Sequence, residues 1–145
     1  MKILFVCYAN VGRSQMAQLM FNKLADGKRV ASSAGIKVID KATGKSREGQ
    51  AIKDVPASKY ALKALKEIGI DGSGQSRHQV TPEDAQAADM VVVMIDPKII
   101  PDFLRDHKNV VFWKVDDPFE HSLQFTRQIR DQIQDLVTKL LKSLP

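Results

Sequence analysis

The stretch near the N-terminus that decides the fold is Ile3-Leu4-Phe5-Val6-Cys7-Tyr8-Ala9-Asn10-Val11-Gly12-Arg13-Ser14. Its first four residues form a short apolar run, which predicts a strand. Apolar residues then recur at helical spacing over residues 16–24, and Asp26-Gly27 ends the pattern. The segment therefore predicts a strand that passes through a short loop directly into a helix.

The rest of the chain repeats this alternation of strands and helices. Further apolar runs at 30–33, 90–95 and 110–113 predict three more strands, and the run at 90–95 is continuous, as in a strand covered on both faces. Helices are expected from Pro56, after Thr81-Pro82, after Asp96-Pro97 and over 125–144. The order β-α-β-α-α-β-α-β-α predicts an α/β fold in which one domain, residues 1–145, holds an open parallel sheet between two helical layers.

Composition excludes several classes of protein. The 145 residues are 43% hydrophobic and 27% charged, with one cysteine, so no internal disulfide can form. A lone cysteine without a signal-peptide pattern predicts a cytoplasmic protein, and no apolar run is long enough for a membrane span. The net charge of +5 is spread along the chain and aromatics are only 6%, so we expect an anionic small ligand rather than a nucleic acid or a membrane.

The loop between the first strand and its helix carries the strongest chemical signal. Cys7 and Arg13 bracket five residues there, and ligands of parallel sheets bind at the carboxyl ends of the strands. Backbone N–H groups that converge at a helix start bind a tetrahedral oxyanion, and the guanidinium adds two matching donors. The same groups favour the thiolate of Cys7, a nucleophile for phosphorus, and the Ser14 hydroxyl can stabilise the sulfur when it leaves.

Such a reaction also needs an acid for the leaving oxygen. Asp96-Pro97 and Asp117-Pro118 each follow a predicted strand, although an isolated Asp-Pro is also a common helix N-cap. The three histidines show no metal-ligand spacing, so we expect neither a metal nor another cofactor. Residues 36–55 leave the carboxyl end of the second strand and are either a mobile wall of the site or a solvated connector.

Over nearly its whole length the chain resembles the low-molecular-weight protein tyrosine phosphatase superfamily. The resemblance rests on the N-terminal loop and on three later pieces in the family's order: Ser33-Ala34-Gly35, residues 79–84 and Asp117-Pro118. It implies a four-stranded parallel sheet of order 2-1-3-4, with Cys7 as nucleophile, Arg13 as phosphate clamp and Asn10 as a prop of the loop. It also implies hydrolysis of phosphoprotein or small aryl phosphate substrates, and binding of inorganic oxyanions.

The resemblance implies that Asp117 rather than Asp96 is the general acid. Two features of the sequence agree: Phe119 can shield Asp117 from water, whereas Lys98 beside Asp96 favours its ionised form. Tyr8 and Phe119 are expected at the mouth of the site, where family phosphatases carry tyrosines after the Asp-Pro pair. The loop residues Ala9, Val11 and Gly12 complete the expected substrate-binding set.

Two other functions remain open at this stage. An arsenate-reducing branch of the superfamily is similar around residues 13–17 and 113–118, but its thioredoxin-coupled members need two further cysteines. Only reduction with an external thiol such as glutathione or mycothiol is then possible. A further branch hydrolyses arginine phosphate and carries a threonine where this chain has the apolar Val11, and this difference argues against that activity. The second of these functions is that of a non-enzymatic module that binds an oxyanion or a protein.

Overall fold

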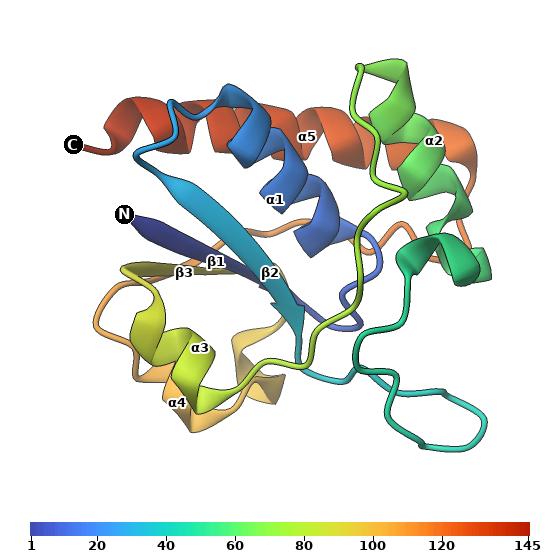
Figure 1. Ribbon diagram of the computed structural model, residues 1–145, viewed down its shortest axis with the longest axis horizontal. Helices are drawn as coiled ribbons and strands as arrows, with labels where there is room; N and C mark the ends of the chain where they lie inside the picture. Colours follow the sequence, from blue (N-terminus) through green and yellow to red (C-terminus); the bar gives the residue numbers. More distant parts are fainter.

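A computed structural model describes residues 1–145. Four parallel strands form one sheet in the order β2-β1-β3-β4, which confirms the α/β fold and the strand order (Figure 1). The strands are β1 (Lys2–Cys7), β2 (Val30–Gly35), β3 (Met90–Val93) and β4 (Val110–Phe112). Because all four run the same way, β1 and β3 deliver their following loops to one edge of the sheet, where the site lies.

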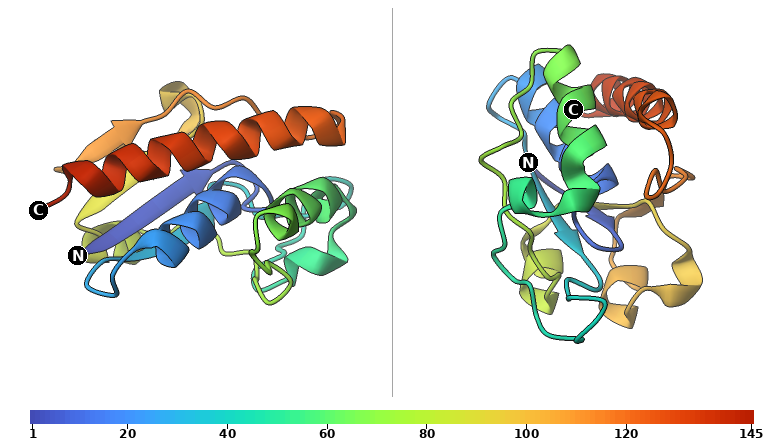
Figure 2. Two further views of the ribbon diagram at one scale, coloured as in Figure 1. Left: turned by 90° about the horizontal axis from the view of Figure 1, so that it is seen from above. Right: turned by 90° about the vertical axis from the view of Figure 1, so that its right-hand side faces the viewer.

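Helices cover both faces of the sheet, as expected. One face carries α1 (Arg13–Leu24), α2 (Lys59–Glu67) and α5 (Leu123–Ser143), and the other carries α3 (Pro82–Ala87) and α4 (Asp102–Arg105) (Figures 1 and 2). Three single turns complete the list: η1 (Ile52–Asp54), η2 (Pro56–Ser58) and η3 (Pro97–Ile99). None of the helices combines the length and the apolar character that crossing a membrane requires.

Strand β1 is the centre of the core because its side chains alternate between two apolar clusters. Ile3 and Phe5 belong to the cluster beneath α1, α2 and α5, which we call the α5 cluster and which includes Phe21 and Ile133. Leu4 and Val6 belong to the cluster beneath α3 and α4, the α3 cluster, which includes Leu104. The strand that precedes the loop between Cys7 and α1 is therefore fixed from both sides.

Local signals in the sequence set several element ends. Thr81 caps α3 through a capping box with Asp84, and Gly69, at φ 81°, follows α2 in the left-handed conformation. The third strand is shorter than predicted and ends at Val93, although the Met94 amide still donates to the Val6 carbonyl at 2.9 Å. The chain then turns into η3, where the Asp96 side chain accepts from the Lys98 amide.

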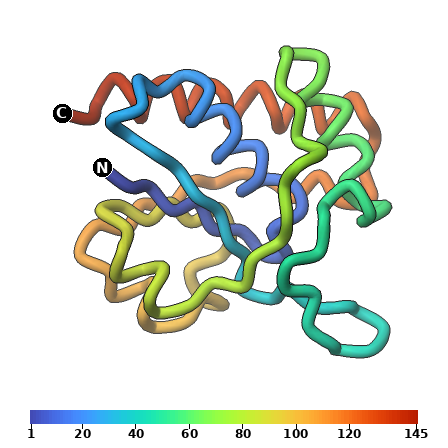
Figure 3. Tube along the Cα trace, viewed as in Figure 1, coloured from blue at the N-terminus to red at the C-terminus, as the bar shows by residue number.

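Residues 36–55 form a long excursion from the carboxyl end of β2. Figure 3 shows this segment swinging away from the sheet and returning toward α2. Two isolated antiparallel bridges hold it, Ile39 with Ser46 and Ala51 with Ser76. It stands beside the loop that follows β1 and forms one wall of the site.

Candidate active site

The loop between β1 and α1 offers a row of free backbone donors. The N–H groups of Tyr8, Ala9, Asn10, Val11 and Gly12 donate to no acceptor in the protein. Asn10 adopts a left-handed backbone at φ 58°, and α1 begins at Arg13. A curved loop of unpartnered N–H groups at a helix start is a binding site for an oxyanion.

Asn10 is wholly buried and connects this loop to three other segments. Its amide nitrogen donates to the hydroxyls of Ser14 at 2.7 Å and Ser33 at 3.1 Å. Its amide oxygen accepts from the His78 backbone N–H at 2.9 Å and from the Gln15 side chain at 3.1 Å. These four contacts stabilise the left-handed residue in the middle of the loop.

Cys7 is the last residue of β1 and is 3% exposed, yet it lines the cavity. Its sulfur lies 2.9 Å from the Ser14 hydroxyl oxygen. Because that oxygen already accepts a hydrogen bond from Asn10, its own proton is free to point at the sulfur. The geometry thus presents Ser14 as a donor to the Cys7 sulfur.

Arg13 is 8% exposed and is held rigidly at one end of its guanidinium. Nη1 donates to the carbonyls of Met94 at 2.8 Å and Val115 at 2.9 Å, which are the chain segments that follow β3 and β4. Nη2 lies 3.7 Å from a carboxylate oxygen of Asp117. The edge of the guanidinium that carries Nε and Nη2 makes no hydrogen bond to the protein and remains available for an anion.

Gly35, the last residue of β2, lets the loop approach that strand closely. A Cβ at this position would lie 2.8 Å from the Tyr8 carbonyl oxygen and 2.9 Å from backbone atoms of Ala9 and Asn10. Real Cβ atoms do not approach backbone so closely. The sequence Ser33-Ala34-Gly35 therefore supplies both a hydroxyl for Asn10 and the space the loop needs.

The structure separates the two candidate acids. Asp117 lines the cavity that contains Cys7, whereas Asp96 does not and instead caps η3. The Asp117 carboxylate also accepts from the Phe119 backbone N–H at 2.9 Å. Its side chain is 57% exposed, so Phe119 does not shield it from water as the sequence suggested. Phe119 instead lies next to the segment of residues 36–55, with the Lys41 ammonium 4.2 Å from its ring centre.

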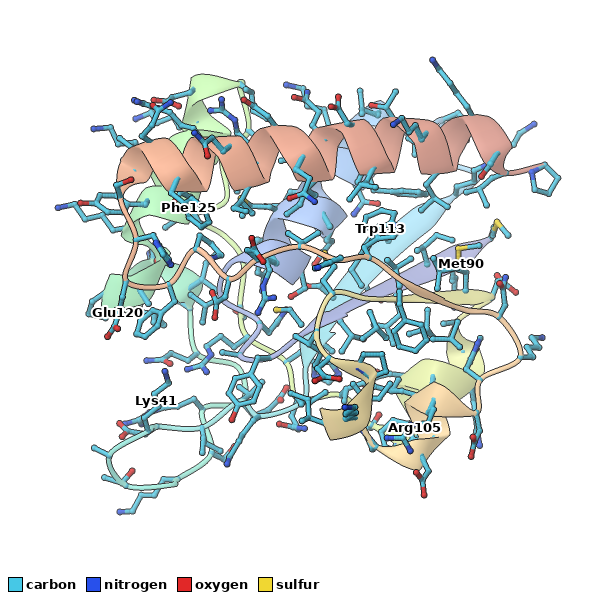
Figure 4. All side chains as sticks on the ribbon, turned by 180° about the vertical axis from the view of Figure 1, so that it is seen from behind. Lys41, Met90, Arg105, Trp113, Glu120 and Phe125 are labelled. Carbon is cyan, nitrogen blue, oxygen red and sulfur yellow. The ribbon has the colours of Figure 1, made fainter.

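The cavity has a volume of about 650 Å³ and gathers the predicted residues. Tyr8, Ala9, Val11, Gly12 and Phe119 line it with Cys7, Arg13 and Asp117, while Asn10 and Ser14 are buried next to it. Its far wall comes from residues 39–61. In Figure 4, Lys41 of that wall and Glu120 of the opposite segment lie at the same end of the molecule.

Three side chains that hold the site escaped the sequence analysis. Gln15 is 1% exposed and links Asn10 to the carbonyl of Ser76. Arg77 is 6% exposed and donates to the carbonyl of Ala9 at 3.1 Å. His78 bridges two carboxylates, Glu48 at 2.8 Å and Asp84 at 2.7 Å. Gln15 contacts Asn10 directly from α1, whereas Arg77 and the His78 backbone N–H reach the loop from the segment before α3. That segment carries no sequence pattern beyond its position just before the Thr81 cap.

The contacts of His78 with Glu48 and Asp84 shift the pKa values of His78 and Glu48. Burial acts to lower the pKa of His78, but the hydrogen bonds that its ring donates to Glu48 and Asp84 outweigh this effect, so the pKa lies above its ordinary value. Burial acts to raise the pKa of Glu48, and its bonds with the Gln79 amide and His78 bring it below normal. Neither this cluster nor any other group of three or more His, Cys, Asp or Glu side chains in the protein could hold a metal ion.

Comparison with known proteins agrees with this geometry. A curated relative from Synechocystis sp., a glutaredoxin arsenate reductase, is 27% identical over 144 residues, which are 99% of this chain and 98% of that protein. A protein-arginine-phosphatase of Bacillus subtilis is 30% identical over 158 aligned positions, covering 99% and 97% of the two chains. The crystal structure of a low molecular weight protein tyrosine phosphatase from T. tengcongensis superposes with a TM-score of 0.75 at 26% identity and 99% coverage of both chains.

The family model described as low molecular weight phosphotyrosine protein phosphatase matches residues 2–145, so it includes every strand, the free N–H groups after Cys7 and the Asp117-Pro118 pair. The match and the site geometry point the same way, and the chain belongs to the low molecular weight phosphotyrosine protein phosphatase family.

Proposed function

We propose that this protein hydrolyses phosphomonoesters through a phosphocysteine intermediate on Cys7. One observation carries the proposal: Cys7 lines the same cavity as most of the loop of residues 8–12, whose five N–H groups are free. Arg13 completes the anion site and Asp117 stands beside it. A thiolate, an oxyanion cradle and a carboxyl group are the parts that a cysteine-dependent phosphatase uses.

In the first step the Cys7 thiolate attacks phosphorus, an S–P bond forms, and the P–O bond to the leaving group breaks. The free N–H groups and the Nε–Nη2 edge of Arg13 take up the charge on the phosphoryl oxygens. The protonated Asp117 carboxyl gives its proton to the leaving oxygen. Its distance of 3.7 Å from Arg13 and its exposed side chain support a role for Asp117 as the acid at the rim of the phosphate site.

In the second step water attacks phosphorus, the S–P bond breaks, and Asp117 takes the proton from the water. The Cys7 sulfur leaves as a thiolate, which gains a hydrogen bond from Ser14. Since Asn10 holds the Ser14 oxygen in place, this donor needs no rearrangement when the charge develops on sulfur.

A chromogenic aryl phosphate tests the proposal directly. We expect turnover that survives EDTA, since Arg13 rather than a metal supplies the positive charge. Cys7→Ser should abolish turnover and keep the affinity for vanadate, measured by calorimetry, because the N–H groups and Arg13 remain. Loss of vanadate binding in a folded Cys7→Ser protein would contradict the proposed organisation of the loop, and dependence on a divalent metal would contradict the cysteine mechanism.

We place the enzyme in the cytoplasm and expect a phosphorylated protein as its partner, with no role in binding nucleic acid. The cavity supports this substrate class because it is much larger than a phosphoryl group alone. Tyr8 and Phe119 offer aromatic surfaces at the loop and at the opposite segment. Phosphotyrosine peptides are accordingly the first substrates to assay after the aryl phosphate.

Arsenate reduction is the second candidate, favoured by the relative from Synechocystis and by an oxyanion site that does not distinguish phosphate from arsenate. Reduction of arsenate to arsenite oxidises two thiols to a disulfide. With a single cysteine in the chain, the second sulfur must come from an external thiol such as glutathione. Incubation with arsenate and a panel of thiols tests this activity, and thioredoxin alone should not support it.

A further inference from the structure

Arg77 is a buried cation whose guanidinium is only partly used by the protein. The residue is 6% exposed and lines the cavity. Nε donates to the Ala9 carbonyl at 3.1 Å, and Nη1 donates to the side-chain oxygen of Gln50 at 3.0 Å. Nη2 makes no hydrogen bond to the protein. One end of a nearly buried guanidinium is thus left free beside the cavity.

No carboxylate compensates the charge of Arg77. None of the protein's ion pairs includes it, although a buried arginine is normally paired. Burial and the neighbouring Arg47 guanidinium lower its pKa, and only the proximity of Cys7 acts in the other direction. An unpaired buried cation that faces a cavity is a site where an anionic ligand group would be stabilised.

This positive site is distinct from the row of free N–H groups. Arg77 holds the carbonyl of Ala9, which belongs to the same peptide unit as the N–H of Asn10. In a trans peptide these two groups point in opposite directions, and the chain has no cis peptides. Arg77 therefore lies on the opposite side of this peptide from the Asn10 N–H, and an oxyanion held by that N–H would not replace its missing partner.

Two neighbours of Arg77 complete the feature. The amide nitrogen of Gln50 makes no hydrogen bond, so Gln50 and Arg77 each offer a free donor from side chains already joined to one another. Lys59 on α2 lines the same wall without an ion pair, while Arg47 is paired with Asp40 at 2.6 Å. The wall formed by residues 39–61 thus has a surplus of positive charge.

We propose that Arg77 and Gln50 form a second anion subsite, and that the substrate is a phosphorylated peptide with an acidic side chain close to the phosphorylated residue. The two free donors match the two oxygens of an Asp or Glu carboxylate. Lys59 adds attraction across the wall. The inference rests on the proposed phosphatase function and names its substrate class.

Matched phosphotyrosine peptides test the subsite. One peptide carries Glu on both sides of the phosphotyrosine and the other carries Gln there, and the ratio of their kcat/KM values is the readout. We expect the acidic peptide to be favoured by about tenfold, the size of one charge-assisted hydrogen bond. Arg77→Gln should bring the ratio close to one, and Arg77→Lys, which keeps the charge and loses the fork, should give an intermediate ratio.

Lys63→Gln is the matched control, because Lys63 is exposed on α2 and lies one turn from Lys59 outside the cavity. It removes the same charge and should leave the ratio unchanged. Since Arg77 also holds the Ala9 carbonyl, its variants can lose absolute rate, and thermal unfolding shows whether they are folded. The ratio within each variant is independent of that loss.

The outcomes separate the two proposals. A wild-type ratio near one, with rapid hydrolysis of the aryl phosphate, overturns the subsite and leaves the phosphatase function intact. Equal loss of the ratio in Lys63→Gln and Arg77→Gln also overturns it, because the preference would then come from overall charge. Failure to hydrolyse the aryl phosphate and both peptides overturns the proposed function itself.

Discussion

Asn10 shows how much a single side chain does in this site. It takes the left-handed backbone conformation, which Asn tolerates better than most residues, and its amide fills four hydrogen bonds to Ser14, Ser33, Gln15 and the His78 backbone. The loop is therefore held in the shape that frees its N–H groups before any ligand arrives. Such preorganisation lowers the cost of binding and of stabilising a transition state.

Asp117→Ala and Asp96→Ala form a pair of variants that identifies the acid. A good leaving group departs without a proton, whereas a poor one needs it. Asp117→Ala should therefore slow aryl phosphates with poor leaving groups by about 10²–10⁴-fold and good ones far less. Asp96→Ala should slow both little, because Asp96 caps η3 and does not line the Cys7 cavity. Steady-state rates over a series of substituted aryl phosphates give the comparison.

The assignment would be reversed if the Asp96 variant showed the leaving-group dependence and the Asp117 variant did not. If neither variant slowed poor leaving groups more than good ones, another group would be the proton donor. Unfolding curves of the two proteins serve as the control, since Asp117 is mostly exposed and its loss should change stability little.

At the residue scale the sequence predicted which proposed site residues lie together better than it predicted the side chains that support them. Cys7 and Arg13 stand at a spacing that a strand and a helix bracket, so their meeting follows from local structure. Arg77 contacts the loop from 68 residues away in the sequence, and Gln15 joins the loop to Ser76 across 61 residues, so no local pattern encodes these contacts. The shielding of Asp117 by Phe119 also depended on such placement, and the structure puts Phe119 against Lys41 instead.

At the scale of elements, the meeting of β2 with the catalytic loop depends on Gly35. Gly35→Ala should force its Cβ against three backbone atoms of residues 8–10 and shift the loop. Such overpacking costs about 1–3 kcal/mol of stability, and we expect vanadate affinity to fall by about tenfold or more. Calorimetry of vanadate binding and thermal unfolding measure the two effects.

Gly74→Ala is the control for this change, since Gly74 lies outside the loop and does not line the cavity. A Cβ there would meet no atom within 4 Å. It should keep both stability and vanadate affinity close to wild type. If Gly35→Ala also bound vanadate normally, close approach of the strand would not be what shapes the loop.

His78 ties the loop of residues 36–55 to the start of α3 through Glu48 and Asp84. Its pKa is raised in the folded protein, so the stability it contributes is fully present below its ordinary value of 6.5 and is lost as the pH rises through the higher folded value. The stability lost in His78→Gln should therefore be larger at pH 6 than at pH 9. Chemical unfolding at the two pH values measures it.

The same substitution at His121, which is exposed and makes no ion pair, serves as the control and should show no such difference. If His78→Gln lost the same stability at both pH values, the protonated imidazole would not be what joins Glu48 to Asp84. Local signals do predict another part of this region, since Thr81-Pro82 predicted the start of α3. The contact of His78 with Glu48 and Asp84 was not predicted, because these three residues come from separate segments.

For the whole molecule, the site depends on a sheet whose two faces pack against different clusters. The alternation of helices and strands predicted this architecture, and the continuous apolar run of the third strand predicted burial on both faces. The sequence did not reveal how residues 39–61 close one side of the cavity, since that segment is polar and irregular. Two antiparallel bridges hold it, one within the segment between Ile39 and Ser46, and one between Ala51 and Ser76 of the segment before α3.

We predict that residues 1–145 unfold as one cooperative domain, and two core variants test this. Ile133→Ala opens a cavity in the α5 cluster and Leu104→Ala opens one in the α3 cluster, and both side chains are fully buried. Each should lose about 2–5 kcal/mol of unfolding free energy. Neither residue lines the Cys7 cavity, so kcat on an aryl phosphate should stay near wild type at temperatures where the proteins are folded.

Trp113, the only tryptophan, makes the result informative because it reports on one face alone. It packs against the α5 cluster, with its ring centre 5.6 Å from that of Phe5. Leu104 lies across the sheet, but β1 carries Phe5 to one face and Leu4 and Val6 to the other, so loss of the α3 cluster should release the strand that supports Trp113. Leu104→Ala should therefore shift the fluorescence transition as far as it shifts the far-ultraviolet circular dichroism transition. If the fluorescence transition stayed at the wild-type midpoint while the dichroism transition moved, the two faces would unfold separately. The prediction of one cooperative domain would then be wrong.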